Sequence, residues 1–589
     1  MARYMHPSVD SKIVDNSFVY QTADGTTALI QVILSEKGPD STLVRVTTDT
    51  EYVHIFGEPN LQKYGQAGYN VINWLKGGGV AYVIRVLPAT STYAVGSLFV
   101  QAKTVGSEKV ITLGTFGPSV SITSIASAKE FITANTVYTD KVSPATIPLG
   151  IMLPKGRGTG YNDLGYRLSL ATEYDATFAF RTYNITITTK DDLGNNEVLE
   201  GPFLISFDPD AKSKSRESLY WVNVLNKYSE FVTVIDNPSA FEKVTGYLLE
   251  KFPAYDPAKL DFIFKRPTLA DTNSTVYSSI RLDSTTVSNG QLFVGNSVNY
   301  FTSGKVGEWT GSNTEESLLV RAYQGLIDPA ITDPNIEFDI ALDANFSPAV
   351  KNAISELCIN LREDTFGIVD LKFQANEQQT VDYRKNTVTV AHRNVAVFAH
   401  DMQVFDPYSG QSIKVTSPYL LATKIPENDN AYGVQYPFVG PRRGAITGFE
   451  NINFIPNPIW RETFYAQRIN YIERDPKKIN FGTQLTSQAQ NSALSDINNM
   501  RVLLKIRREV TKMLKDYRME FSDATTYESI NYNLAGYLQT WISNRACSSI
   551  SGNCYASEYD KMQKQARVDI NLTFTGIIER FSFQLIVNR

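Results

Sequence analysis

The order of strand-like and helix-like segments in this chain is interrupted and later resumed. Two strand-like runs lie between residues 27 and 46 and are separated by a turn at 36–39. A helical pattern covers 64–75 and ends at three glycines, and a nearly continuous apolar run follows at 80–86. This β–α–β order is typical of an α/β core. The pattern is then interrupted and returns only near residue 336.

The stretch between the two α/β parts has a different composition. From about residue 90 to 330, Ser and Thr dominate, apolar runs are short and turn residues recur, which is typical of β-rich domains. We expect two of its strands at 185–189 and 202–207. The predicted fold class is therefore α/β with mixed α+β content, in a multidomain chain with β-rich insertions.

The second part of the core begins with a strand at 338–342. A helix should start at Ser347-Pro348, because Ser is a favoured N-cap and Pro a favoured first helical residue. Further strands are predicted at 366–371 and 387–398. The following stretch, 401–460, is rich in Pro, Gly and Tyr, and we expect it to be irregular.

Composition excludes several classes of protein. Three cysteines in 589 residues exclude a disulfide framework and fit a reducing compartment. The first residues lack the apolar segment of a signal peptide, and no run of 18 apolar residues predicts a membrane span. Residues 441–589 hold 20 Lys and Arg against 14 Asp and Glu, a net +6; since the whole chain is −5, the remaining 440 residues carry −11. This imbalance favours one basic face that meets an acidic partner.

A long helix predicted at about 494–517 carries the clearest charge pattern. Its cations recur at spacings of 4, 3, 4 and 3, which places them on one stripe of the helix. The stripe consists of Arg501, Lys505, Arg508, Lys512 and Lys515. A solvated face, an acidic protein partner and a nucleic acid are the three readings of such a stripe, and the absence of interleaved aromatics disfavours nucleic acid. A second helix, at about 527–545, is the rival contact surface.

Candidate chemical sites are weak. His392 and His400 could share a strand face beside Asp401, but a structural role is the simpler interpretation. The Gly156–Gly160 segment lacks the Lys-Ser/Thr pair of a phosphate loop and is typical of a tight turn. Four aspartates could act as acids and bases or could simply end strands and cap helices: Asp339, Asp343, Asp364 and Asp370. We therefore predict no catalytic residue, no metal site and no cofactor.

The last segments of the chain alternate apolar and polar residues with the period of half-buried strands. The first strand is expected at 568–574. The second would use Ile577, Phe581, Phe583, Leu585 and Val587. An extended N-terminal arm carries Ile13, Val14, Phe18 and Tyr20. Strands this close to chain ends need a sheet, either their own or that of a neighbouring copy.

Short motifs spread over most of the chain follow one order and spacing. The early ones are Pro7, Gly38-Pro39, Phe56-Gly57, Tyr64 to Leu75, Gly77-Gly78-Gly79 and Ala81 to Val86. The later ones are Phe203 to Phe207, Tyr220 to Ser229, Leu361 to Asp364, Gly367 to Asp370, Ile479 to Leu485, Asn498 to Arg501 and Glu579. In these motifs the chain resembles the contractile tail sheath proteins of myovirus-type bacteriophages.

The resemblance implies a non-enzymatic structural subunit of the virion, assembled in the host cytoplasm. Its main partner would be itself, in homo-hexameric rings stacked into a helical tube around a tail tube protein, with baseplate and tail terminator proteins at the ends. No nucleic acid contact and no stable membrane insertion are implied. The sheath would contract from a metastable extended state, drive the tube through the host envelope and so allow genome ejection. The basic stripe would face the tube, and the terminal arms would exchange strands between subunits.

The resemblance also implies a core domain built from both chain ends. With it, the sequence predicts seven parts. These are an N-terminal extended arm (1–20), the first part of the α/β core (21–95), inserted β-rich protruding domains (96–330), the second part of the core (331–400), an irregular connection (401–460), a C-terminal core domain facing the tube (461–575) and a strand-exchange arm (576–589). Two alternatives remain open. The first is the sheath of a non-phage injection or type VI-like secretion system, and the second is a β-rich virion adhesin or glycan-active protein.

Overall fold

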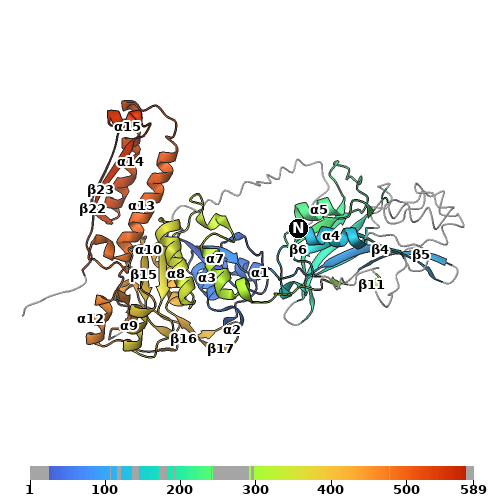
Figure 1. Cartoon of the computed structure of the whole chain (residues 1–589), viewed down its shortest axis with the longest axis horizontal. Coiled ribbons are helices and arrows are strands. Elements are labelled where there is room, and N and C mark those ends of the chain that lie inside the picture. Colours follow the sequence, from blue (N-terminus) through green and yellow to red (C-terminus); the bar gives the residue numbers. More distant parts are fainter. Residues whose placement is uncertain are drawn as a thin grey trace, which may run out of the picture.

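The chain forms an elongated molecule with an α/β core between two projecting parts (Figure 1). The inserted sheets project from one side of the core, and a helical pair with a β-hairpin projects from the other. This computed structural model describes residues 26–578 apart from 106–107, 116–120, 136–144, 172–179, 181, 191–193, 241, 243–290, 293–297 and 477.

The core is a seven-stranded sheet in the order β19-β15-β14-β13-β1-β3-β2. Every neighbouring pair is parallel except β2 with β3. The strands are β1 (Ala28–Ile33), β2 (Leu43–Val46), β3 (Val80–Arg85), β13 (Ile340–Leu342), β14 (Phe366–Asp370), β15 (Val395–Phe398) and β19 (Ile469–Asn470). Strands from both predicted parts of the core lie side by side in this sheet, which confirms the mixed α/β fold class.

Helices cover both faces of the core sheet, so its central strands are buried on both sides. One face packs against α1 (Asp49–Phe56), α3 (Ala67–Lys76) and α10 (Pro418–Tyr432). The other face packs against α7 (Glu315–Tyr323), α8 (Pro348–Glu356), α9 (Glu377–Asn386) and α12 (Pro458–Ala466). The short helices are α2 (Leu61–Tyr64) and α11 (Gly440–Arg443). As predicted, α3 ends at Gly77 and α8 begins at Ser347-Pro348.

The insertion contains two antiparallel sheets with the strand orders β10-β6-β4-β5-β11 and β12-β7-β8-β9. The first holds β4 (Gly96–Val105), β5 (Glu108–Thr115), β6 (Ala145–Pro154), β10 (Val232–Asp236) and β11 (Gln291–Leu292). The second holds β7 (Gly165–Leu170), β8 (Tyr183–Lys190), β9 (Asn196–Ile205) and β12 (Asn299–Tyr300). The insertion also carries α4 (Ile125–Asn135) and α5 (Trp221–Tyr228). Because α7 packs on the core sheet, the chain returns to the core before the predicted boundary at residue 330.

The prediction of irregular structure over 401–460 is wrong. This stretch forms a three-stranded sheet of β16 (Asp401–Asp406), β17 (Gln411–Thr416) and β18 (Asn451–Ile452). Helices α10 and α11 lie between β17 and β18 in the sequence, and α12 starts after β18. Pro418 occupies the first turn of α10, where no backbone N–H is needed, and Pro426 lies buried inside it. The predicted strand at 387–398 is also too long, since only Val395–Phe398 joins the sheet.

The C-terminal part divides between the core and the projection. It comprises β20 (Ile472–Arg474), β21 (Ile479–Phe481), α13 (Ile497–Lys515), α14 (Ala524–Ser543), β22 (Cys547–Tyr555), α15 (Glu558–Met562) and β23 (Arg567–Phe574). The first half of α13 packs into the core, and its second half packs against α14 and the hairpin. Both predicted helices and the first terminal strand are confirmed within a few residues. Among the described helices, none combines the length and apolarity that crossing a bilayer requires.

A buried ion triad lies at the carboxyl ends of two neighbouring strands of the core. Asp343 follows β13, Asp370 ends β14, and Lys351 of α8 forms ion pairs with both, at 2.7 Å from Asp370. All three side chains are at most 1% exposed. Burial and the charge of Asp370 raise the pKa of Asp343 to about 6. For Asp370, burial alone would raise the pKa, but the Lys351 charge outweighs it and leaves the pKa lowered. These two aspartates therefore fix α8 to the sheet and are not accessible to a substrate.

Replacing Lys351, the cation of the triad, should destabilise the fold, because two buried carboxylates would remain without a positive charge. We expect Lys351→Met to lower the free energy of unfolding by about 4 kcal/mol, because neither aspartate keeps a counter-charge. Lys385→Met, an exposed change on α9, is the matched control and should stay within about 0.5 kcal/mol. Urea unfolding of the full chain measures both. A Lys351→Met loss no larger than that of the control would contradict the role given to the triad.

Candidate functional site: helix α13 and the C-terminal hairpin

The basic stripe of α13 faces the chain's own core. Arg501 forms an ion pair with Asp429 of α10. Arg508 contacts Asp339 at 2.7 Å and Asp364 at 3.4 Å. These acids lie between 72 and 169 positions away in the sequence. The stripe therefore does meet acidic groups, but Arg501, Arg508 and also Lys512, which pairs with Glu337, meet them inside the same chain.

The prediction that all five cations line an accessible surface is wrong for two of them. Arg501 is 4% exposed and Arg508 is 8% exposed. A buried guanidinium needs counter-charges and acceptors, and these arginines have them in place. For Asp339 and Asp364, burial alone would raise the pKa, but the neighbouring arginine charges outweigh it and leave both pKa values lowered.

The three lysines of the stripe are more accessible. Lys512 pairs with Glu337 and, at 3.3 Å, with Glu509 of its own helix. The Nζ of Lys515 donates to Asn335 Oδ1 at 2.9 Å. Among the residues that the structure describes, Lys505 forms no ion pair. A tube contact through these lysines remains a prediction.

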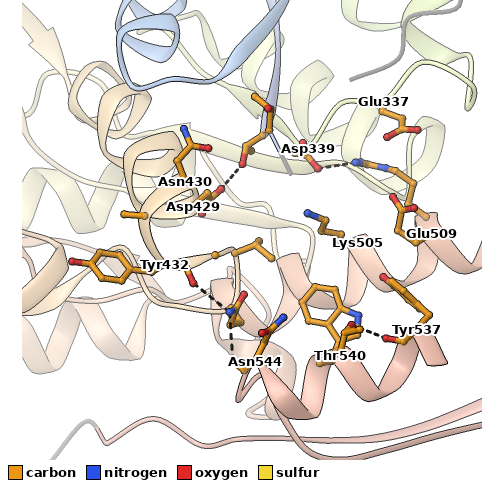
Figure 2. A pocket seen from close by; sticks show the side chains of 18 of the residues that line it. Glu337, Asp339, Asp429, Asn430, Tyr432, Lys505, Glu509, Tyr537, Thr540 and Asn544 are labelled. Carbon is orange, nitrogen blue, oxygen red and sulfur yellow. Dashed lines mark hydrogen bonds and ion pairs between the residues drawn. The ribbon is translucent and has the colours of Figure 1, made fainter. Parts of the chain in front are cut away.

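A cavity of about 610 Å³ separates this side of the core from α14. Figure 2 shows Lys505 in the middle of the cavity. Asp339 and Asp429 lie on the side of the core, and Tyr537 and Asn544 lie on the side of α14. Carboxylates and cations in the wall neutralise one another in pairs, since Arg508 faces Asp339 and Lys512 faces Glu337. Most charges of the wall are thus paired within the chain, and Lys505 is the lining cation that forms no ion pair among the described residues.

The hairpin of β22 and β23 offers an open strand edge. The two strands pair only with each other among the described residues. Burial alternates along β23, whose apolar side chains face the helices while its polar ones face outward. This confirms the period-2 pattern predicted for residues 568–574.

A groove of about 410 Å³ with one apolar side runs beside that edge. Its apolar side includes three residues of β23 and several of α13, among them Val568, Ile570, Leu572, Leu503, Ile506 and Val510. The rest of its lining is largely polar and comprises Glu363, His392, Arg393, Asn394, Arg507 and Thr511. The hairpin packs on α14 through β22 and leaves this side of α13 partly uncovered. An additional strand beside β23 would cover the groove and satisfy the backbone groups of the edge.

Most predicted strand-exchange residues lie outside the described part of the chain. These are Ile13, Val14, Phe18, Tyr20, Phe581, Phe583, Leu585 and Val587. Ile577 is described and is half-buried, and its neighbour Ile578 is 72% exposed. Residues 575–578 form neither a strand nor a turn, so the chain does not fold back along β23 within that segment.

The other candidate groups have structural environments. His400 is buried, and burial lowers its pKa to about 4, while His392 accepts a hydrogen bond from the N–H of Asn394. No group of three or more His, Cys, Asp or Glu suited to a metal ion occurs within the described ranges. The Gly156–Gly160 segment follows β6 and contacts the turn at 36–38, whose backbone fills the space that a phosphate would need. The segment is a bend that continues into a short 3-10 helix at Thr159–Tyr161, so it is a connection rather than a simple tight turn.

Comparison with known proteins gives similar structures only. No protein-family model and no curated protein matches the chain. It is similar to a sheath tail protein from Listeria innocua, with 9% identity and a TM-score of 0.48 over 94% of this chain and 96% of that one. A sheath tail protein from Desulfitobacterium hafniense shows 8% identity and a TM-score of 0.46 over 97% and 100%. The contracted sheath of the PVC extracellular contractile injection system shows 14% identity and a TM-score of 0.38 over 46% and 79%. These three similar structures are described as sheath tail proteins or as a sheath complex.

The ion pairs of Arg508 should make a large contribution to stability. We expect Arg508→Ala to lower the free energy of unfolding by about 3 kcal/mol at pH 7, because Asp339 loses its main counter-charge and Asp364 keeps only Arg362. Carboxyls with lowered pKa values stabilise the fold above their unfolded pKa of about 4, and this contribution is lost as the pH falls through the folded value. The difference from the unaltered chain should therefore shrink below about pH 4. Lys515→Ala is the control and should change stability by less than about 0.5 kcal/mol, and equal losses in the two variants would count against the assignment.

Proposed function

We propose that the chain is the structural subunit of a contractile sheath, which polymerises with copies of itself around an inner tube. The observation that carries the proposal is the free edge of β23 beside the groove on α13. The order of the short motifs in the sequence, which resembles that of contractile tail sheath proteins, supports the same proposal. The proposed role is mechanical, with no catalytic step and no cofactor.

The occupant that fits the groove is the segment 577–587 of a neighbouring copy. Its apolar residues Phe581, Phe583, Leu585 and Val587 repeat with period 2, as a strand paired with β23 requires. Backbone hydrogen bonds would give affinity, and the alternating side chains would enter the groove and fix the register. The absence of a turn at 575–578 favours a neighbour over the chain's own hairpin as the acceptor.

Strand addition of this kind generates an open assembly. Each copy donates one strand and accepts another, and a contact that does not close into a dimer continues as rings or helices. We propose hexameric rings stacked around a tail tube, with baseplate and terminator proteins at the ends. Contraction would release energy stored in a metastable set of interfaces, and the donated strands would keep neighbours linked while the rigid parts move.

The setting we propose is a phage tail, assembled in the host cytoplasm and carried on the virion. The motifs resemble those of phage sheaths, and the large insertion favours a phage over a secretion or extracellular injection system. Purified full-length protein should form hollow, striated tubes in negative-stain electron micrographs. Uniform monomers at concentrations where a sheath assembles would favour the adhesin alternative.

A charge placed in the groove should block assembly without unfolding the chain. We expect Ile570→Lys to reduce the assembled fraction about tenfold or more, because a third strand would bury the ammonium group. Asn571→Lys is the matched control, since it adds the same charge on the outer, exposed face of β23. Sedimentation and electron microscopy measure assembly, and a thermal melt reports folding. Tubes formed equally well by both variants would argue against the groove as the acceptor, and deletion of 577–589 should give the Ile570→Lys result.

A further inference from the structure

Arg85, the last residue of β3, is a fully buried cation at the junction of the core and the insertion. Its guanidinium donates five hydrogen bonds to four backbone carbonyls. Three of these carbonyls belong to the β1–β2 turn of the core, at Ser35, Glu36 and Gly38, with distances of 2.9 to 3.1 Å. The fourth is the carbonyl of Arg157 in the insertion, at 2.7 Å. One side chain therefore binds the backbones of both parts.

The loop that carries Arg157 fits closely against the same turn. A Cβ atom at Gly156 would lie 2.0 Å from the carbonyl oxygen of Gly38. At Gly158, where φ is +123°, a Cβ would lie 3.0 Å from Nη2 of Arg85. Tyr161, the last residue of the loop, accepts a hydrogen bond from the N–H of Gly38 at 2.8 Å. The glycine spacing of this segment thus reflects close backbone approach to the core.

A second polar contact, between Asp40 and Arg157, lies beside the hydrogen bonds of Arg85. Asp40 of the core accepts hydrogen bonds from the backbone N–H and the guanidinium of Arg157, at 3.0 Å from the N–H and 2.6 Å from Nη2. The two side chains are only 7% and 13% exposed, so water screens the pair weakly. Loop 156–161 is therefore held by the core on three sides: from Arg85, from Asp40 and from the backbone of Gly38.

We propose that loop 156–161 is a latch that fixes the insertion to the core, so that the two parts move as one body. Without it, the junction would rest on the two chain crossings, which pair with each other at Thr92 with Lys305 and at Val95 with Thr302, and on the edge-to-face contact of His54 in α1 with Phe231, whose ring centroids are 5.1 Å apart. Two paired strands bend readily, and relative motion is the usual behaviour of domains joined in this way. The latch removes that freedom because it joins the insertion to the turn at 35–40 of the core and, through the N–H of Gly158 donating to the carbonyl of Thr92 at 3.1 Å, to one of the crossings as well. It acts within one copy, so it does not depend on the proposed assembly.

A methyl group at Gly156 should open the latch without altering either hydrophobic core. Cysteines introduced at Lys129 in α4 and Gln378 in α9 provide exposed labelling sites, and the three native cysteines are buried. Single-molecule energy transfer in doubly labelled protein, diluted into unlabelled protein, gives the distribution of distances between insertion and core. We expect a narrow distribution in the parent chain and a broadened one in Gly156→Ala. Arg157→Ala should broaden it less, since the Arg157 carbonyl still accepts from Arg85.

Hydrogen exchange distinguishes an opened latch from a damaged fold. In Gly156→Ala we expect exchange to increase about tenfold in peptides covering 35–41 and 156–161, and to stay unchanged in β1 and β8. Gly536→Ala in α14, where a Cβ meets nothing within 4 Å, is the control and should change neither measurement. An unchanged distance distribution in Gly156→Ala would overturn the proposal. Faster exchange throughout β1 or β8 would also overturn it, because the loop would then be a general requirement of the fold.

Discussion

The position of the C-terminal elements depends on two arginines of α13 that are buried against carboxylates of the core. Asp339 precedes β13 and Asp364 precedes β14, so Arg508 joins α13 to the amino ends of two parallel strands. Asp339 also accepts the N–H of Ala28 at the start of β1. Once these charges are buried, α13 has no other orientation that keeps them paired. The hairpin packs on the second half of α13 and on α14. Its position relative to the core therefore depends on the ion pairs of Arg501 and Arg508.

Carboxylates also fix a helix at the opposite ends of the same strands. At the carboxyl ends of β13 and β14, Asp343 and Asp370 bind Lys351 and so fix α8. In many parallel sheets, polar groups at that edge serve a ligand. Here they are covered and satisfied by the chain itself, and they pair with a cation that reaches no solvent. The acidic residues of the core thus hold helices at both ends of the strands.

Local patterns in the sequence predicted the elements better than their surroundings. The apolar run at 80–86, the glycines after α3 and the Ser347-Pro348 start of α8 are short-range signals, and each was confirmed. The spacing of the α13 cations correctly placed them on one face. It could not show what that face meets, because Asp429 and Asp339 are distant in the sequence and Asp429 lay in a stretch predicted to be irregular. Proline content misled there, since a proline in the first turn of a helix costs no hydrogen bond.

The two joints of the molecule differ in the physics that holds them. The latch at Arg85 uses a buried charge, several carbonyl acceptors and glycines that admit no side chain, so any displacement leaves polar groups unsatisfied in a dry interior. The edge of β23 instead offers a row of backbone groups and a partly open groove with one apolar side. A strand bound there retains its backbone hydrogen bonds while its flanking residues bend, because strand pairing constrains the paired segment and not the chain beyond it. A subunit of the proposed sheath, which would stay linked to its neighbours while its own parts keep a fixed geometry, needs this combination: a rigid joint within the copy and a compliant one between copies.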